Sequence, residues 1–127
     1  MAKTILIVDD EEDIRNMLKI ALEKDGFLVE TADNGQAALD QIDRRRPDLV
    51  LLDLKMPRRN GYHLFAQLKS DEKLQAIPII VITALTQGSD REDSEWARRM
   101  GAEGFLTKPF DLDELGRRVG EMVAKAL

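Results

Sequence analysis

The chain has 127 residues and a formal net charge of −5, and it is 43% apolar and 34% charged. This length suits one domain, the composition excludes a disordered or fibrous chain, and the acidic balance argues against non-specific binding to nucleic acid or anionic membranes. The absence of cysteine excludes disulfides, thiolate metal sites and thiol catalysis. From the length and the composition we expect one globular domain over residues 1–127.

The first half of the chain alternates apolar runs with helical patterns. The run Ile5–Val8 is unbroken and predicts a strand that is covered on both faces. Apolar residues then recur at the spacing of one helix face, and the pattern stops near Gly26. The residues of this face are Ile14, Met17, Leu18, Ala21 and Leu22. A weaker run, Phe27–Thr31, predicts a second strand, and a second helical pattern ends before Pro47.

The second half repeats the alternation. The runs Leu49–Leu52 and Ile79–Ile82 predict two further buried strands, and Gly104–Thr107 predicts a weaker fifth. Helical patterns lie between and after these runs, the last of them beginning at a capping box formed by Asp111 and Glu114. Alternation of this kind predicts a doubly wound α/β fold, in which helices cover both faces of a parallel sheet.

No apolar run approaches the roughly 20 residues that a membrane-spanning helix needs. The N-terminal residues have only a short apolar run before acidic residues begin, which does not fit a signal peptide. We therefore expect a cytoplasmic domain with no membrane partner.

Polar residues stand at the ends of four predicted strands. The first strand ends in Asp9 and Asp10, and the third ends in Asp53. The fourth ends in Thr83 and the fifth in Lys108. Because ligands of open parallel sheets bind at the carboxyl ends of the strands, we expect these side chains to surround one crevice.

Crowded carboxylates repel one another unless a cation is present, and Mg²⁺ suits two or three aspartates plus a carbonyl oxygen. A lysine and a hydroxyl beside them predict a site for a dianionic phosphoryl group, with one carboxylate as its acceptor. Each position alone has a structural explanation, since aspartate forms turns and acids are favoured in the first turn of a helix, as for Glu11, Glu12 and Asp13. Their coincidence at four strand ends favours the site.

Four segments also resemble a known family. They are Ile5–Glu11 (ILIVDDE), Leu51–Pro57 (LLDLKMP, followed by Gly61), Pro78–Ala84 (PIIVITA) and Gly101–Phe110 (GAEGFLTKPF). In this order and spacing they resemble the receiver domains of response regulators, the CheY-like superfamily, over essentially the whole chain. The resemblance implies a flavodoxin-like (βα)5 fold with strand order 2-1-3-4-5.

The resemblance also implies a site. Asp53 would be the phosphoacceptor and would receive its phosphoryl group from a histidine kinase or a phosphotransfer protein. Asp10, Asp53 and the backbone carbonyl of Lys55 would hold Mg²⁺ with help from Asp9, and Lys108 would pair with the phosphoryl oxygens.

A switch would follow phosphorylation. By resemblance, Thr83 would move to hydrogen-bond the phosphoryl group and Phe105 would change rotamer. The surface formed by the fourth helix, fifth strand and fifth helix would then change its affinity for a downstream effector protein or domain. Such a domain catalyses its own phosphorylation and dephosphorylation and has no external turnover substrate.

Three other functions share parts of this pattern. A phosphatase of the haloacid-dehalogenase type expects its nucleophile in Asp-x-Asp after the first strand, whereas Asp9 and Asp10 are adjacent. A flavodoxin-like flavin binder needs a glycine- and hydroxyl-rich loop where acids stand here. A scaffold that has lost its site is disfavoured by four residues that remain present, namely Asp10, Asp53, Thr83 and Lys108.

Overall fold

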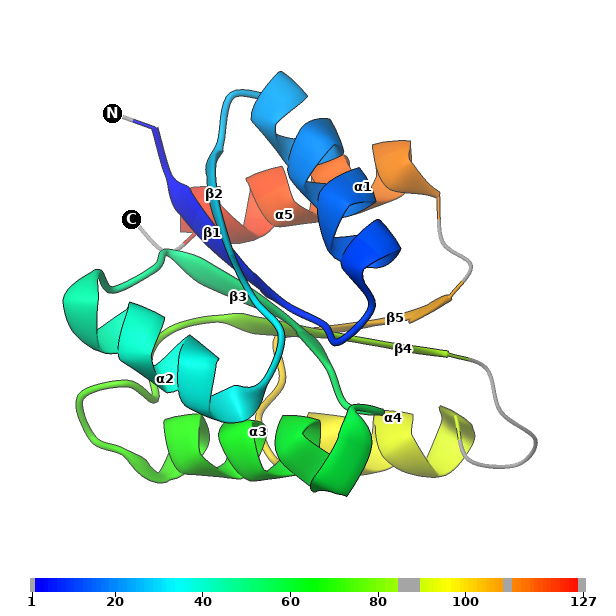
Figure 1. Ribbon diagram of the computed structural model, residues 1–127. Coiled ribbons are helices and arrows are strands. Elements are labelled where there is room, and N and C mark those ends of the chain that lie inside the picture. Colours follow the sequence, from blue (N-terminus) through cyan, green and yellow to red (C-terminus); the bar gives the residue numbers. More distant parts are fainter. Residues whose placement is uncertain (1, 85–89, 109–110, 126–127) are drawn as a thin grey trace.

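The computed structural model describes residues 2–84, 90–108 and 111–125; for residues 59, 83–84, 90–94 and 125 it describes the backbone only. Five parallel strands form one sheet in the order β2-β1-β3-β4-β5 (Figure 1). The strands are β1 (Thr4–Val8), β2 (Leu28–Ala32), β3 (Leu49–Asp53), β4 (Ile79–Ala84) and β5 (Gly104–Lys108). The predicted fold class and strand order are confirmed.

Helices cover both faces of this sheet. They are α1 (Glu12–Lys24), α2 (Gly35–Arg44), α3 (Asn60–Ser70), α4 (Asp90–Arg99) and α5 (Leu112–Lys125), and a short 3₁₀ helix (Pro57–Arg59) precedes α3. Figure 1 shows α1 and α5 on one face and α2, α3 and α4 on the other. Each helix follows a strand, as right-handed βαβ crossovers require.

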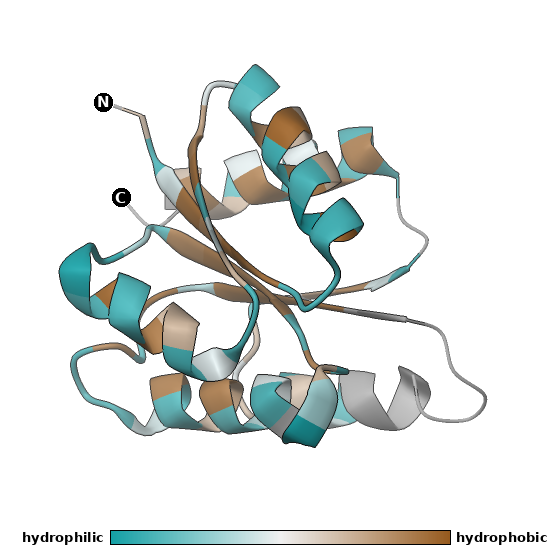
Figure 2. Cartoon of the chain, viewed as in Figure 1, coloured by the Kyte–Doolittle hydropathy of each residue, from teal (hydrophilic) through white to brown (hydrophobic). Residues whose placement is uncertain are grey.

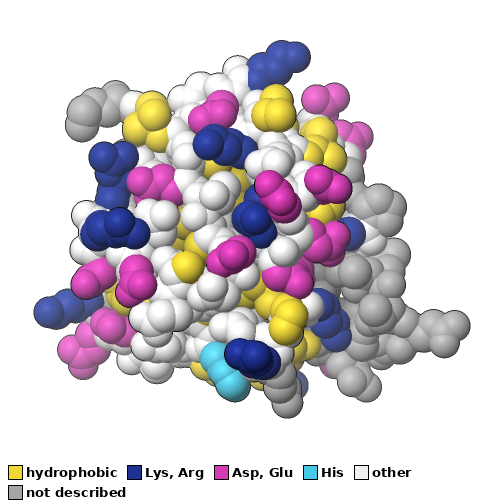
Figure 3. Space-filling model, viewed as in Figure 1, with side chains coloured by type: hydrophobic (Ala, Val, Ile, Leu, Met, Phe, Trp, Pro, Cys, Tyr) yellow, Lys and Arg dark blue, Asp and Glu magenta, His cyan; other side chains and the backbone are white. Residues whose placement is uncertain are grey.

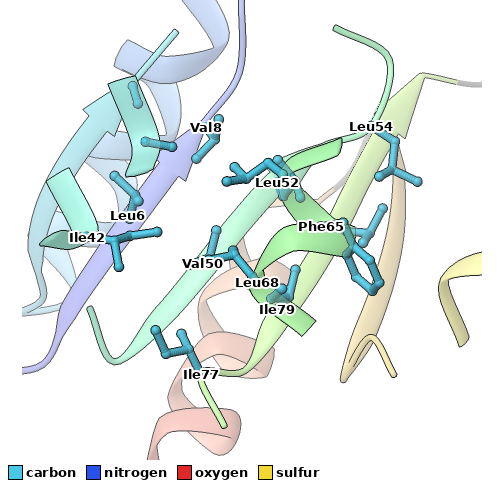
Figure 4. Close-up of a cluster of buried hydrophobic side chains, with 14 of the residues drawn as sticks. Leu6, Val8, Ile42, Val50, Leu52, Leu54, Phe65, Leu68, Ile77 and Ile79 are labelled. Carbon is cyan, nitrogen blue, oxygen red and sulfur yellow. The ribbon is translucent and has the colours of Figure 1, made fainter. Parts of the chain in front are cut away.

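Alternate residues of the central strands build two cores. Leu6 and Val8 face a cluster with Leu52 and Phe65 (Figure 4), whereas Ile5 and Ile7 face a cluster beneath α1 and α5. Figure 2 shows hydrophobic residues along β1 and β3. Because both faces are covered, these strands need apolar side chains on both sides, which explains the unbroken apolar runs in the sequence.

Two predictions of detail were wrong. The second strand spans Leu28–Ala32 rather than the predicted Phe27–Thr31, although its place at the edge of the sheet agrees with the predicted strand order. Met17 was assigned to the buried face of α1, but its side chain is 39% exposed, while Leu18 and Leu22 are buried. Met17 lies on the rim of the helix face, where periodicity alone does not separate core from surface.

The end of β3 and the start of α3 are in close contact at Gly61. A Cβ atom at this position would lie 2.2 Å from the carbonyl oxygen of Asp53 and 2.5 Å from the Cα of Leu54. Only glycine leaves room for this approach, which fixes α3 against the end of β3. Within the described part of the chain, none of the helices is both long and apolar enough to cross a membrane.

Candidate functional site

Asp9 lies directly after β1 and is 2% exposed. Its Oδ1 accepts a hydrogen bond from the backbone N–H of Glu11 at 2.9 Å, and its Oδ2 accepts one from Nζ of Lys108 at 2.8 Å. Arg15 of α1 donates from Nη1 to the backbone carbonyl of Asp9 at 2.6 Å. The turn between β1 and α1 is therefore held from three directions.

Asp53 is the last residue of β3 and is 3% exposed. Its Oδ1 accepts a hydrogen bond from the backbone N–H of Lys55 at 2.9 Å, and Nζ of Lys108 lies 3.4 Å from its Oδ2. Burial raises the pKa of Asp53 to about 6, assisted by the charge of Asp9, although the Lys55 N–H and the charge of Lys108 act in the opposite direction. The structure therefore holds a buried carboxylate at an electrostatic cost.

Lys108 ends β5 and reaches back across the carboxyl edge of the sheet. Its ammonium lies 2.8 Å from Asp9, 3.4 Å from Asp53 and 3.5 Å from Glu11, and its side chain is 11% exposed. Burial would lower the pKa of Lys108, but the Asp9 hydrogen bond and the neighbouring carboxylate charges outweigh this, so its pKa lies above the ordinary value. Lys108 is therefore a protonated cation among three carboxylates.

Four carboxylates converge beside this lysine. Asp9, Asp10, Glu11 and Asp53 each offer an oxygen, and these oxygens all lie within 4.8 Å of one another. Asp10 and Glu11 are exposed and Asp9 and Asp53 are buried, so the cluster opens to solvent on one side. A donor set made only of carboxylate oxygens fits a hard cation such as Mg²⁺ that keeps several waters.

The structure brings together Asp9, Asp10, Asp53 and Lys108, as the strand ends predict. Thr83 pairs through its backbone with Thr107, one residue before Lys108, but its side chain lies outside the described residues. The predicted role of its hydroxyl therefore stays a prediction.

The other two predicted positions flank this group. The backbone of Lys55 follows Asp53 and donates its N–H to that carboxylate, which holds the β3–α3 loop beside the cluster. Phe105 pairs with Val81 across β4 and β5 and is partly buried against the core beneath α3 and α4. Trp96 of α4 packs against the same core, with ring centroids 5.2 Å from Tyr62 and Phe65.

Sequence reasoning missed Glu11. It was explained as an acid of the first helical turn, but its carboxylate lies 3.5 Å from Nζ of Lys108 and belongs to the four-carboxylate cluster. The position of Glu11 directly after the Asp9–Asp10 pair is the sequence feature that could have indicated its place in the cluster.

Comparison with known proteins agrees with this geometry. The family described as "Response regulator receiver domain" matches residues 5–120. The chain is 42% identical over 119 residues to the phosphate regulon transcriptional regulatory protein PhoB of Pseudomonas aeruginosa, spanning 94% of this chain and 51% of that protein. It is 38% identical over 120 residues to Protein PilH of the same organism, spanning 94% of this chain and 97% of that protein.

The solved structures that this chain resembles are also response regulators and receiver domains. The chain resembles a putative response regulator from Chloroflexus aurantiacus with a TM-score of 0.89 at 34% identity, covering 98% of this chain and 99% of that one. It also resembles the signal receiver domain of a signal transduction histidine kinase from Syntrophus aciditrophicus, with a TM-score of 0.87 at 34% identity, covering 98% and 92%. The chain thus spans about half of some relatives and nearly all of others.

Proposed function

The chain belongs to the response regulator receiver domain family, whose members are signalling switches, and on this premise we propose that Asp53 is its phosphoacceptor in a Mg²⁺-dependent reaction. The observation that carries the proposal is the position of Lys108, whose ammonium contacts the buried Asp9 and Asp53 beside a four-oxygen cluster. A structural ion pair needs one carboxylate, whereas this site gathers four.

The reaction is an in-line displacement at phosphorus. A carboxylate oxygen of Asp53 forms a bond to phosphorus as the bond from phosphorus to the donor breaks, and the donor leaves with that electron pair. Asp10, Asp53 and the carbonyl of Lys55, with help from Asp9, would hold Mg²⁺, which supplies positive charge for the phosphoryl oxygens.

Lys108 supplies the protein's own positive charge. In the unphosphorylated chain its ammonium is divided among Asp9, Asp53 and Glu11. When the phosphoryl group adds negative charge at Asp53, Lys108 has a stronger partner within reach. The pKa of about 6 leaves Asp53 mainly ionised at neutral pH, so the nucleophile is available.

The switch is carried from β4 and β5 to the surface. Thr83 hydrogen-bonds the phosphoryl group and Phe105 repacks in response. Phe105 and Trp96 of α4 pack on the same core, so a change at β5 reaches the surface formed by α4, β5 and α5. An effector protein or domain binds that surface with an affinity that depends on phosphorylation.

The partners follow from this role. A histidine kinase or a phosphotransfer protein donates the phosphoryl group, and the domain works in the cytoplasm without contacting nucleic acid directly. The chain has no external turnover substrate, because its product stays attached to Asp53 until the site hydrolyses it.

Acetyl phosphate tests the proposal without a kinase. Incubation with Mg²⁺ is expected to add the mass of one phosphoryl group, and EDTA or Asp53→Asn is expected to abolish the addition. Asp48→Asn is the matched control, because Asp48 precedes the same strand and accepts a hydrogen bond from the backbone of Thr4 at its opposite end. Retained modification in the Asp53 variant, or multiple turnover of a phosphomonoester, would contradict the proposal.

A further inference from the structure

The loop between β3 and α3, residues 54–59, supplies backbone groups to the candidate site. The N–H of Lys55 donates to Oδ1 of Asp53 at 2.9 Å, and the carbonyl of Lys55 is one of the proposed Mg²⁺ ligands. Figure 3 shows several acidic side chains (magenta) close together where α1 begins, on the side where the carboxylate cluster opens to solvent. Because a backbone group has no rotamer of its own, its position in the site depends on the contacts that hold the loop.

The second half of this loop has an unfavourable backbone conformation. Pro57–Arg59 form one turn of 3₁₀ helix, and within it Arg58 has a φ of 59° and a ψ of 23°. A residue with a Cβ atom rarely adopts this left-handed conformation, and Arg58 is exposed, so burial does not compensate the strain. Contacts elsewhere must therefore hold the loop in this shape.

Asn60, the first residue of α3, makes such contacts on two sides. Its Nδ2 donates a hydrogen bond to the carbonyl oxygen of Pro57 at 2.8 Å, and its backbone N–H donates to the same carbonyl. Its Oδ1 accepts a hydrogen bond from the backbone N–H of Gly35 at 3.2 Å. Asn60 thus joins the loop to the first residue of α2, a helix that follows a different strand.

The start of α2 lies close against Asn60. Gly35 is buried, and a Cβ atom at this position would lie 3.1 Å from Oδ1 and 3.5 Å from the carbonyl oxygen of Asn60. The first N–H groups of a helix have no acceptor within it, so the N–H of Gly35 needs one from elsewhere. Asn34 satisfies a different group of this helix end, since its side chain accepts from the N–H of Ala37 at 2.9 Å. The two asparagines therefore act differently: Asn34 within α2, and Asn60 between α2 and the loop.

We propose that Asn60 is a positioning residue of the Mg²⁺ site, which fixes the carbonyl of Lys55 by tying the β3–α3 loop to the start of α2. This inference rests on the proposed function, in which that carbonyl is a ligand. One residue, Met56, separates Lys55 from Pro57, and its side chain is 4% exposed in the core. The chain is thus held just before and just after this carbonyl, which leaves it little freedom to turn.

Calorimetric titration of the unphosphorylated chain with Mg²⁺ tests the proposal. Asn60→Ala should raise the dissociation constant about tenfold, because binding must then fix a carbonyl that the wild-type loop already holds. Asn34→Ala is the matched control, since it removes the other asparagine at the start of α2 and its capping hydrogen bond but leaves the connection to the loop. The control should bind Mg²⁺ like the wild-type chain.

Hydrogen exchange of the Lys55 amide provides a readout that needs no metal. Asn60→Ala should speed this exchange about tenfold, because the loop opens more often and releases the hydrogen bond to Asp53. Asn34→Ala should leave the exchange unchanged. Gly35→Ala disturbs the same contact from the side of α2, so it should change the exchange and the Mg²⁺ affinity in the same direction as Asn60→Ala.

The phosphorylation rate separates positioning from general damage to the site. With acetyl phosphate, Asn60→Ala should raise the Mg²⁺ concentration for half the maximal rate about tenfold, while the rate at saturating Mg²⁺ stays within about twofold of the wild-type rate. Asn60→Asp should restore the wild-type Mg²⁺ dependence, because its carboxylate accepts the N–H of Gly35 and its backbone N–H still donates to Pro57. Circular dichroism checks that each variant is folded.

Three results would overturn this inference alone. They are an Asn60→Ala chain with unchanged Mg²⁺ affinity and Lys55 exchange, equal losses of Mg²⁺ affinity in Asn60→Ala and Asn34→Ala, and an Asn60→Asp chain that binds Mg²⁺ as weakly as Asn60→Ala. A wild-type chain that binds no Mg²⁺ would instead overturn the proposed function, and this inference with it.

Discussion

Two partly buried lysines lie near opposite ends of the strands of one sheet: Lys69 at the amino edge, where the strands begin, and Lys108 at the carboxyl edge, where they end. Lys69 and Lys108 have side chains that are each 11% exposed, and each contacts carboxylate. At the amino edge, Lys69 pairs with Glu103 at 3.0 Å, and Glu103 also accepts a hydrogen bond from the backbone N–H of Ile79 at 2.8 Å. At the carboxyl edge, Lys108 is shared by Asp9, Asp53 and Glu11.

The difference is one of charge balance. At the amino edge one ammonium meets one carboxylate, whereas at the carboxyl edge one ammonium faces three carboxylates with a fourth, Asp10, nearby. Burial, assisted by the charge of Asp9, raises the pKa of Asp53, so the ionised form of this carboxylate costs the folded chain stability. The carboxylates of the carboxyl edge therefore suit a cation, whereas the ion pair of the amino edge is balanced by itself.

Exchanging each lysine for methionine should separate these roles most clearly. Lys108→Met should slow phosphorylation by acetyl phosphate at saturating Mg²⁺ about 100- to 1,000-fold, because the positive charge beside the phosphoryl oxygens is lost. Lys69→Met should leave that rate nearly unchanged and lower the free energy of unfolding by about 1 kcal/mol. Equal effects of the two variants on the phosphorylation rate would contradict the different roles assigned to the two lysines.

A pair of helical glycines tests how the carboxyl edge is positioned. Gly61→Ala should lower the free energy of unfolding by about 3 kcal/mol, because its Cβ would overlap the carbonyl oxygen of Asp53 at 2.2 Å. Gly120→Ala has nothing within 4 Å of the new Cβ and should stabilise α5 by about 0.5–1 kcal/mol. Urea unfolding measures both free energies. A Gly61→Ala chain as stable as the wild-type one would show that the close contact between α3 and the end of β3 does not require glycine.

The raised pKa of Asp53 predicts a pH dependence of the free energy of unfolding. The pKa of Asp53 is about 6 in the folded chain and 3.8 in the unfolded one, so the folded chain loses stability as pH rises through this window. Asp53→Asn removes that loss and should be more stable than the wild-type chain by about 2 kcal/mol at pH 8 without Mg²⁺. The gap should close as pH falls below about 4.

Mg²⁺ and the amino edge supply the controls for this prediction. Saturating Mg²⁺ should narrow the gap at pH 8, because the cation binds the wild-type carboxylate. Asp48→Asn, which changes the carboxylate that accepts the Thr4 N–H at 2.7 Å, should destabilise the chain by about 1 kcal/mol instead. A destabilising Asp53→Asn at pH 8 would contradict the raised pKa of Asp53.

The smallest effect concerns the residue at the open side of the cluster. Glu11 is 60% exposed and 3.5 Å from Lys108, so Glu11→Gln should weaken Mg²⁺ binding only about two- to fivefold. Glu12→Gln, one residue further on and outside the cluster, is the control and should have no effect. Calorimetric titration at low salt measures both, and equal affinities of the two variants would remove Glu11 from the site.

Much of the fold could be predicted because strands that are buried on both faces consist of apolar residues, and such runs are visible in the sequence. β1, β3 and β4 are covered on both faces, so their apolar runs are unbroken. The edge strand β2 has weaker burial, with Leu28 at 50% exposure, and its start was predicted one residue early. Met17 lies on the rim of the buried face of α1, where periodicity alone does not separate core from surface.

The grouping of the candidate site residues in space could be predicted for a similar reason. Asp53 and Lys108 end parallel strands and Asp9 directly follows one, and the sheet necessarily brings those ends to one edge. Glu11 was missed because its contact depends on how far Lys108 reaches from β5, and helix preferences already explained an acid there. The switch roles of Thr83 and Phe105 come from family resemblance and stay predictions.

Chemical trapping of the phosphorylated residue tests the central claim most directly. Borohydride reduces an acyl phosphate to an alcohol, so a chain treated with acetyl phosphate and Mg²⁺, then reduced and digested, should carry homoserine at position 53 alone. Homoserine at Asp9 or Asp10, or an unmodified Asp53 in a chain that has gained a phosphoryl group, would contradict the account.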